Sequence, residues 1–217
     1  MKHEKQLLTF PEAILFDWDN TLVSSFEIIK KSMNAALSYF DKPVWSDAEI
    51  RQYTQLSAKD GLPVIFGDHW PKALDIFSEC YQNNVANMLT ALPGALSLLQ
   101  AGKQANIPMA VISNKRSKFL HHEIKQFGWE SFFQVIIGSG DLAEDKPSPL
   151  PVYHVLEQMG LEAGPAIWFV GDAPVDWHCA EASGCLPIPI GEGVVEAKNY
   201  AQFVANYLEL EKILLKR

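Results

Sequence analysis

Cysteine is scarce in this chain of 217 residues, which has only Cys80, Cys179 and Cys185. Three thiols cannot all pair with one another, and none of them forms a CxxC motif. The pattern disfavours a disulfide framework and favours reduced, buried thiols in a cytosolic protein.

Long apolar runs are also missing. No run approaches the roughly 18 residues that a membrane-spanning helix requires, and residues 1–12 are charged where a signal peptide would be apolar. Basic residues are fewer than acidic ones: the chain has 18 Lys and Arg and 26 Asp and Glu, which gives a formal net charge of -8. We therefore predict a cytoplasmic protein with no nucleic-acid partner and no membrane partner.

The composition that remains is that of an ordinary globular protein, 48% hydrophobic and 20% charged. At about 150 residues per domain, the length fits one domain, or one domain with an insert. Five short apolar runs stand out, at 13–16, 109–112, 135–137, 166–170 and 186–190. Such runs are typical of strands buried on both faces of a parallel sheet. Pro187 and Pro189 lie in the last run, so we expect that strand at an edge of the sheet.

Helical patterns alternate with these runs. Residues 117–127 follow the second run, residues 150–159 precede the fourth, and residues 176–183 follow it. The alternation predicts an α/β fold with a doubly wound, mainly parallel, Rossmann-like sheet. We also expect a terminal helix over residues 195–217.

The long connection after the first run is the exception to this alternation. Apolar residues recur there at spacings of three and four, and we see no strand between residues 24 and 92. Ser24 with Glu27, and Ser46 with Glu49, have the capping-box pattern of helix starts. We therefore predict an all-α domain over residues 24–92, inserted into an α/β core domain of residues 1–23 and 93–217.

Polar side chains follow the first four runs, at the edge where ligands bind in open α/β sheets. They are Asp17 and Asp19, then Ser113 and Asn114, then Lys146, then Asp172 and Asp176. Carboxylates gathered on one rim repel each other and need a counter-charge, which a divalent cation and a lysine would supply. Oxygen ligands without a histidine cluster suit Mg²⁺. A carboxylate, a hard cation, a lysine and a hydroxyl together indicate phosphoryl transfer through an aspartyl-phosphate.

Four segments in this order resemble the haloacid dehalogenase superfamily of phosphohydrolases, and most closely the phosphoglycolate phosphatases. The segments are FDWDNTL at 16–22, VISNK at 111–115, KP at 146–147 and VGDAPVD at 170–176. The helical insert after the first segment is similar to that family's cap domain, and we call residues 24–92 the cap. The resemblance implies a Mg²⁺-dependent phosphatase acting on a small, soluble phosphomonoester.

The resemblance also implies residue roles in catalysis and metal binding. Asp17 would be the nucleophile and a metal ligand, and Asp19 the general acid and base that also offers its backbone carbonyl to the metal. Lys146 would hold the nucleophile and the phosphate. Asp172 would be a metal ligand, and Asp176 would either bind the metal through water or orient Lys146.

Phosphate and substrate binding are implied for a second group. Ser113 would hydrogen-bond the phosphoryl group with Asn114 nearby, and Thr21 of the first segment is grouped with them. Lys59 is our candidate within the cap for gripping the substrate.

Two departures from the family pattern stand out: Trp18 is bulky for its position, and residues 173–175 are less polar than usual. Trp18 would pack beneath the sheet, because successive side chains of a strand face opposite ways.

Two other functions remain open. A phosphomutase of the β-phosphoglucomutase type shares the cap and the motifs, and would pass the phosphoryl group to a second sugar hydroxyl rather than to water. A non-catalytic interaction protein on the same scaffold is the other alternative. We expect a monomer or a weak homodimer.

Overall fold

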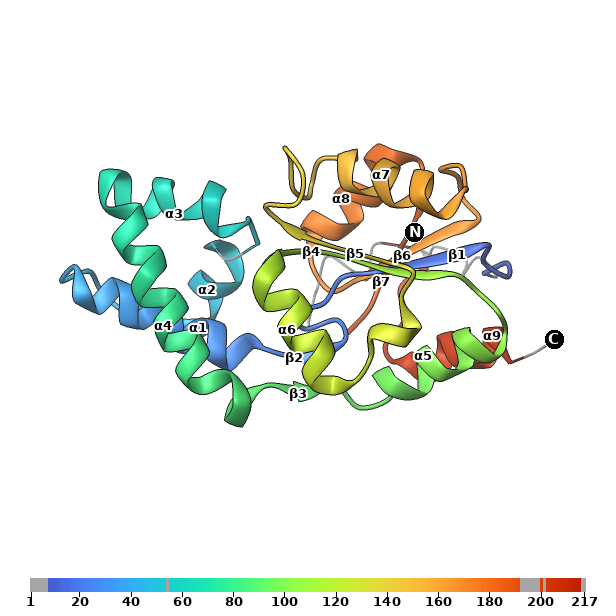
Figure 1. Cartoon of the computed structure of the whole chain (residues 1–217), viewed down its shortest axis with the longest axis horizontal. Coiled ribbons are helices and arrows are strands. Elements are labelled where there is room, and N and C mark those ends of the chain that lie inside the picture. Colours follow the sequence, from blue (N-terminus) through green and yellow to red (C-terminus); the bar gives the residue numbers. More distant parts are fainter. Residues whose placement is uncertain (1–7, 54, 192–199, 201, 216–217) are drawn as a thin grey trace.

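A computed structural model of the protein describes residues 8–53, 55–191, 200 and 202–215. At its centre is a sheet of five parallel strands in the order β5-β4-β1-β6-β7 (Figure 1). The strands are β1 (Ala13–Phe16), β4 (Met109–Arg116), β5 (Val135–Ser139), β6 (Ile167–Gly171) and β7 (Leu186–Pro189). The predicted parallel sheet is confirmed, and the strand that contains both prolines lies at its edge.

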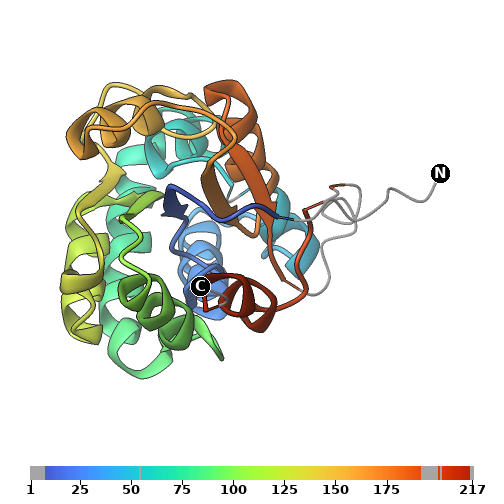
Figure 2. The same cartoon turned by 90° about the vertical axis from the view of Figure 1, so that its right-hand side faces the viewer.

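Helices cover both faces of this sheet, as Figure 2 shows. They are α5 (Ala95–Gln104), α6 (Ser117–Phe127) and α9 (Tyr207–Leu214) on one face, and α7 (Leu150–Met159) and α8 (Pro174–Ser183) on the other. The residues of β1 divide between the two: Ile14 and Phe16 join one buried cluster, and Ala13 and Leu15 join the other. Every residue of β1 is therefore apolar, because both of its faces are covered.

The cap is helical, as predicted, and stands apart from the sheet (Figure 1). Its elements are α1 (Phe26–Tyr39), α2 (Asp47–Tyr53), α3 (Ala58–Phe66), the short 3-10 helix η1 (Gly67–His69) and α4 (Trp70–Met88). These helices share a buried apolar cluster that includes Leu37, Ile50 and Phe66. Pro71 lies in the first turn of α4, where its missing N–H leaves no hydrogen bond unmade.

Two details of the cap differ from the sequence predictions. A short strand, β3 (Thr90–Ala91), pairs antiparallel with β2 (Val23–Ser24), so the two chain crossings into the cap lie side by side. We expected no strand there, because two residues are too few to leave a pattern. The Ser46–Glu49 capping box forms, but α1 begins after Ser25 with no side-chain cap.

The C-terminal helix is shorter than predicted. It spans Tyr207–Leu214, and residues 200 and 202–206 are not helical. The rest of the predicted stretch, 195–199, 201 and 216–217, lies outside the described residues. Among the described elements another short 3-10 helix, η2 (Glu130–Phe132), follows α6. Within the described ranges, none of the helices combines the length and apolar character needed to cross a membrane.

The three cysteines are free thiols in the structure. Cys179 and Cys185 are buried, and Cys80 is partly exposed. The prediction of buried, reduced thiols is thus confirmed for two of the three.

Candidate active site

Polar residues from three neighbouring strands meet at the sheet edge that faces the cap. Asp17 directly follows β1, Asp172 directly follows β6, and Ser113 lies within β4. With the cap, this edge encloses a cavity of about 270 Å³. The structure brings seven of the predicted residues to the cavity wall: Asp17, Asp19, Ser113, Asn114, Lys146, Asp172 and Asp176.

Asp17 and Lys146 form a buried ion pair in this cavity. The Lys146 Nζ lies 2.6 Å from Asp17 Oδ1 and 2.6 Å from Asp176 Oδ1. Burial raises the pKa of Asp17 to about 6, although Lys146 acts to lower it. Burial alone would lower the pKa of Lys146, but Asp17 and Asp176 outweigh it and raise that pKa. The lysine is therefore held charged beside the predicted nucleophile.

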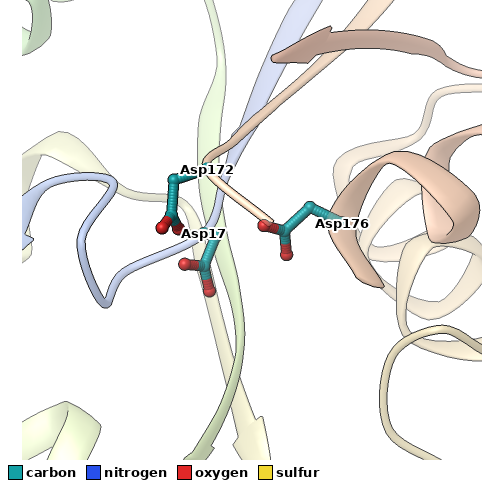
Figure 3. A group of neighbouring side chains, drawn as sticks. All are labelled: Asp17, Asp172 and Asp176. Carbon is teal, nitrogen blue, oxygen red and sulfur yellow. The ribbon is translucent and has the colours of Figure 1, made fainter. Parts of the chain in front are cut away.

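Asp17, Asp172 and Asp176 point toward one another, as Figure 3 shows. One carboxylate oxygen of each lies within 4.8 Å of the others. Burial, followed by the charges of Asp17 and Asp176, raises the pKa of Asp172 well above its ordinary value. The raised pKa values show that one lysine does not compensate three clustered negative charges, so the fully charged cluster needs a further cation. This donor set fits a hard divalent cation bound by oxygen.

Asp176 is anchored on the first turn of α8 by both carboxylate oxygens. Its Oδ1 accepts from Lys146, and its Oδ2 accepts from the backbone N–H of Ala173 at 3.1 Å. Gly171 makes room for it, because a Cβ at that position would lie 2.4 Å from the Asp176 side chain. The contact with Lys146 is one of the two roles implied for Asp176.

Asn114 holds Lys146 from the backbone side. Its amide donates to the Lys146 carbonyl at 2.9 Å and to the Gln55 carbonyl at 3.1 Å, and its Oδ1 accepts from the Lys146 N–H at 3.0 Å. Both of its N–H donors are thus engaged. The Asn114 side chain thus places Lys146 and joins the cap to the core, while the residue lines the cavity beside Ser113, where we predicted that it would help bind the phosphoryl group.

Thr21 is likewise engaged away from the cavity. It is fully buried, and it does not line the cavity. Its Oγ1 donates to Asp172 Oδ1 at 3.2 Å and accepts from the Asp172 N–H at 3.1 Å. Thr21 therefore orients a carboxylate of the acidic cluster, and our grouping of it with the phosphate-binding residues is corrected on this point. Ser113, which lines the cavity, keeps that prediction.

Lys59, like Thr21, is a predicted site residue that does not line the cavity. Its ammonium lies 3.1 Å from Asp145 Oδ2 and 3.4 Å from the Ala143 carbonyl, on the loop that precedes Lys146. The neighbouring residues Ser57 and Ala58 line the cavity, but Lys59 does not. Its side chain connects the cap to the core, because an acidic residue of the core lies within its reach.

Replacing Lys59 with alanine is expected to lower kcat/KM by less than about fivefold, by a similar factor on every substrate. The reason is that a partly exposed ion pair contributes at most about 1 kcal/mol. Steady-state kinetics on phosphomonoesters with a charged and with an uncharged leaving group would check this, with Asp145→Asn as the matched variant. A loss confined to substrates whose leaving group carries its own negative charge would show that Lys59 reaches the substrate, as the sequence suggested.

The cap half of the cavity is mainly apolar. Its wall includes Phe26, Ile29, Met33, Leu62, Leu74 and Phe77. Arg51 adds a cation at this wall, with its guanidinium 4.1 Å from the centre of the Phe26 ring. The cavity therefore has an ionic end on the core and a less polar end on the cap.

Binding of Mg²⁺ to the acidic cluster is expected to raise the thermal midpoint, and to raise it more at pH 8 than at pH 5. The pKa of Asp17 is raised from 3.8 to about 6 on folding, so its protonation stabilises the metal-free fold at low pH. That stability is lost as the pH rises through about 6, where a cation takes the proton's place. Thermal melts in Mg²⁺ and in EDTA at both pH values would measure the effect.

Asp172→Asn is the matched variant for this experiment, since it removes one carboxylate with little change in shape. It should melt at nearly the same temperature with and without Mg²⁺. An equal Mg²⁺ effect in Asp172→Asn and in the wild type would place the cation elsewhere.

Residues 14–188 match the family model of the haloacid dehalogenase-like hydrolases. A phosphoglycolate phosphatase of Pasteurella multocida is 30% identical over 190 residues, covering 82% of this chain and 84% of the relative. A phosphoglycolate phosphatase of Chromobacterium violaceum is 27% identical over 199 residues, covering 86% of this chain and 87% of the relative.

Solved structures show the same fold. A predicted phosphoglycolate phosphatase from Haemophilus somnus superimposes with a TM-score of 0.83 at 24% identity, covering 95% of this chain and 99% of the other. A hydrolase of the haloacid dehalogenase superfamily from Ehrlichia chaffeensis superimposes with a TM-score of 0.66 at 27% identity, covering 96% of this chain and 98% of the other.

Proposed function

The chain belongs to the haloacid dehalogenase-like hydrolases, and from that premise we propose that it is a Mg²⁺-dependent phosphatase of small phosphomonoesters that works through an aspartyl-phosphate on Asp17. The single observation that best supports the proposal is the buried Asp17–Lys146 pair beside Asp172 and Asp176. A carboxylate held against a cation at the wall of a cavity is suited to attack a phosphoryl group.

In the first step, a carboxylate oxygen of Asp17 forms a bond to phosphorus, and the bond from phosphorus to the ester oxygen breaks. Lys146 balances the negative charge of the phosphoryl oxygens, and Ser113 hydrogen-bonds one of them. Asp19 gives its proton to the departing ester oxygen, so that an alcohol leaves.

In the second step, Asp19 takes a proton from water as the water oxygen bonds to phosphorus. The bond between phosphorus and Asp17 then breaks, and inorganic phosphate leaves with the carboxylate restored. Asp17, Asp172 and the Asp19 carbonyl would hold Mg²⁺, which supplies further charge neutralisation for the phosphoryl oxygens.

The cavity and the relatives support a small phosphorylated substrate. A cavity of about 270 Å³ holds a small ester rather than a polymer. The two curated relatives are phosphoglycolate phosphatases, so 2-phosphoglycolate heads the panel of substrates to test. We further propose, as the sequence predicts, that the protein acts in the cytoplasm as a monomer or weak homodimer.

A phosphate-release screen tests this function. We expect Mg²⁺-dependent release of phosphate from at least one of 2-phosphoglycolate, sugar phosphates, nucleotides and an aryl phosphate. Excess EDTA should abolish the release, and Ca²⁺ should inhibit it, because Ca²⁺ takes more ligands at longer distances. Full activity in excess EDTA would refute the metal role, and transfer of the phosphoryl group to a sugar without release would indicate a mutase.

A further inference from the structure

A second group of buried charges lies beside the site, and the steps above leave three of its members without a role. Lys115 is on β4, Glu123 on α6 and Tyr81 on the cap helix α4. The Lys115 Nζ lies 2.6 Å from Asp19 Oδ1, 2.7 Å from Glu123 Oε2 and 2.8 Å from the Tyr81 hydroxyl. Lys115 therefore connects the proposed acid and base to Glu123 and Tyr81.

Every polar group of this network has a partner. An ammonium has three N–H donors, and those of Lys115 meet three acceptors of the protein. The Tyr81 hydroxyl accepts from Lys115 and donates to Glu123 Oε1 at 2.9 Å. Glu123, which is 1% exposed, thus faces Lys115 and Tyr81 with its two oxygens. Lys115 lines the cavity but has no donor left for a substrate.

Trp18 belongs to the same network and lies between the two predicted catalytic aspartates. Its Nε1 donates to Glu123 Oε2 at 2.7 Å, and its ring packs edge-on against Trp129. Glu123 therefore has two contacts beside the site. It holds Trp18, which stands between Asp17 and Asp19 in the chain, and it holds Lys115, which contacts Asp19. The hydrogen bond to Glu123 explains the bulky Trp18 at a position where the family usually has a smaller residue.

We propose that Lys115, held in place by Glu123 and Tyr81, is a positioning residue that fixes the Asp19 carboxylate for both proton transfers. Lys115 binds Asp19 through Oδ1. A carboxylate fixed through one oxygen presents the other in a set direction, and Oδ2 is then the atom that carries the proton to the ester oxygen and takes one from water. The inference rests on the proposed phosphatase function. Because Tyr81 belongs to the cap, the alignment of Asp19 also depends on where the cap lies.

The test uses 4-nitrophenyl phosphate and Lys115→Met. 4-Nitrophenolate leaves without a proton, so formation of the aspartyl-phosphate does not need Asp19, whereas its hydrolysis does. In stopped-flow experiments with Mg²⁺, the variant should release one equivalent of nitrophenol in a fast burst. Its steady-state turnover should then be about 10²-fold slower than that of the wild type. Asp19→Asn should show the same profile, and Lys125→Met, on the exposed side of α6, should behave as the wild type.

Further variants separate positioning from folding. Lys115→Met alone leaves two acidic groups without their cation, so Lys115→Met combined with Glu123→Gln restores the charge balance. Tyr81→Phe is milder, and should lower steady-state turnover by a smaller factor with the burst intact.

Three variants decide the outcome: Lys115→Met, Lys115→Met with Glu123→Gln, and Tyr81→Phe. The inference is overturned if the initial release of nitrophenol and the steady-state rate fall together in all three, or if neither rate changes. Failure of the phosphatase function itself gives a different result: the wild type would then release no phosphate from any substrate in the panel.

Discussion

Replacing Asp17 with asparagine is expected to reduce turnover by roughly 10³-fold or more, which corresponds to about 4 kcal/mol of barrier. The substitution keeps the shape of a side chain that is 8% exposed, but an amide is a very poor nucleophile toward phosphorus. Phosphate release under saturating Mg²⁺ would measure the loss.

The stability of Asp17→Asn separates chemistry from folding. The pKa of Asp17 is raised to about 6 by burial, so its charged form opposes folding of the metal-free protein above that pH. The metal-free variant should therefore be at least as stable as the metal-free wild type at pH 8. Residual activity within tenfold of the wild type would exclude an aspartyl-phosphate on Asp17.

Replacing Lys146 with methionine should reduce both activity and stability. The ammonium contacts Asp17 and Asp176, and the Lys146 side chain is 2% exposed, so its loss leaves two buried carboxylates without their cation. Breaking a buried pair in this way costs about 3–5 kcal/mol, and activity should fall by roughly 10³-fold. Urea unfolding in EDTA, together with phosphate release, would measure the two effects.

The double variant Lys146→Met with Asp176→Asn is the control for the stability effect. It removes one charge of each sign, so it should recover a large part of the lost stability while remaining inactive. Recovery of activity in the double variant would show that Lys146 acts only by balancing the charge of Asp176.

The sheet was predictable because burial on both faces leaves a local mark in the sequence. The first strand was predicted with both of its ends, since Ala13–Phe16 is apolar throughout and is followed by Asp17. The strand with Met109 was predicted to end at Ile112 but continues to Arg116, because its last residues are polar and belong to the site. The pair of two-residue strands at the base of the cap left no pattern at all.

The predicted roles of single residues depended on contacts that no local pattern records. Asn114 and Thr21 stand in the right motifs, yet their side chains hold Lys146 and Asp172. Lys59 was our candidate within the cap for gripping the substrate, but Asp145, which is 86 positions further on, lies within its reach. One signal for the Lys115 network was available in advance: Glu123 stands on the buried face of an amphipathic helix, where a charge requires a partner.

The sequence by itself determined the sheet, the helical insert and the four segments that carry the family's chemistry. Each depends on the order of residues along a single strand or helix. The spacing at which apolar residues repeat in such an element is short, so one segment of sequence is enough to recognise it. Only the tertiary structure decided which charges are paired. Trp18 and Glu123 are 105 positions apart, and Asp17 and Lys146 are 129 apart. Contacts over such separations arise when helices and strands pack together. The same packing buries Asp17, which raises its pKa, and places the Lys146 ammonium against its carboxylate.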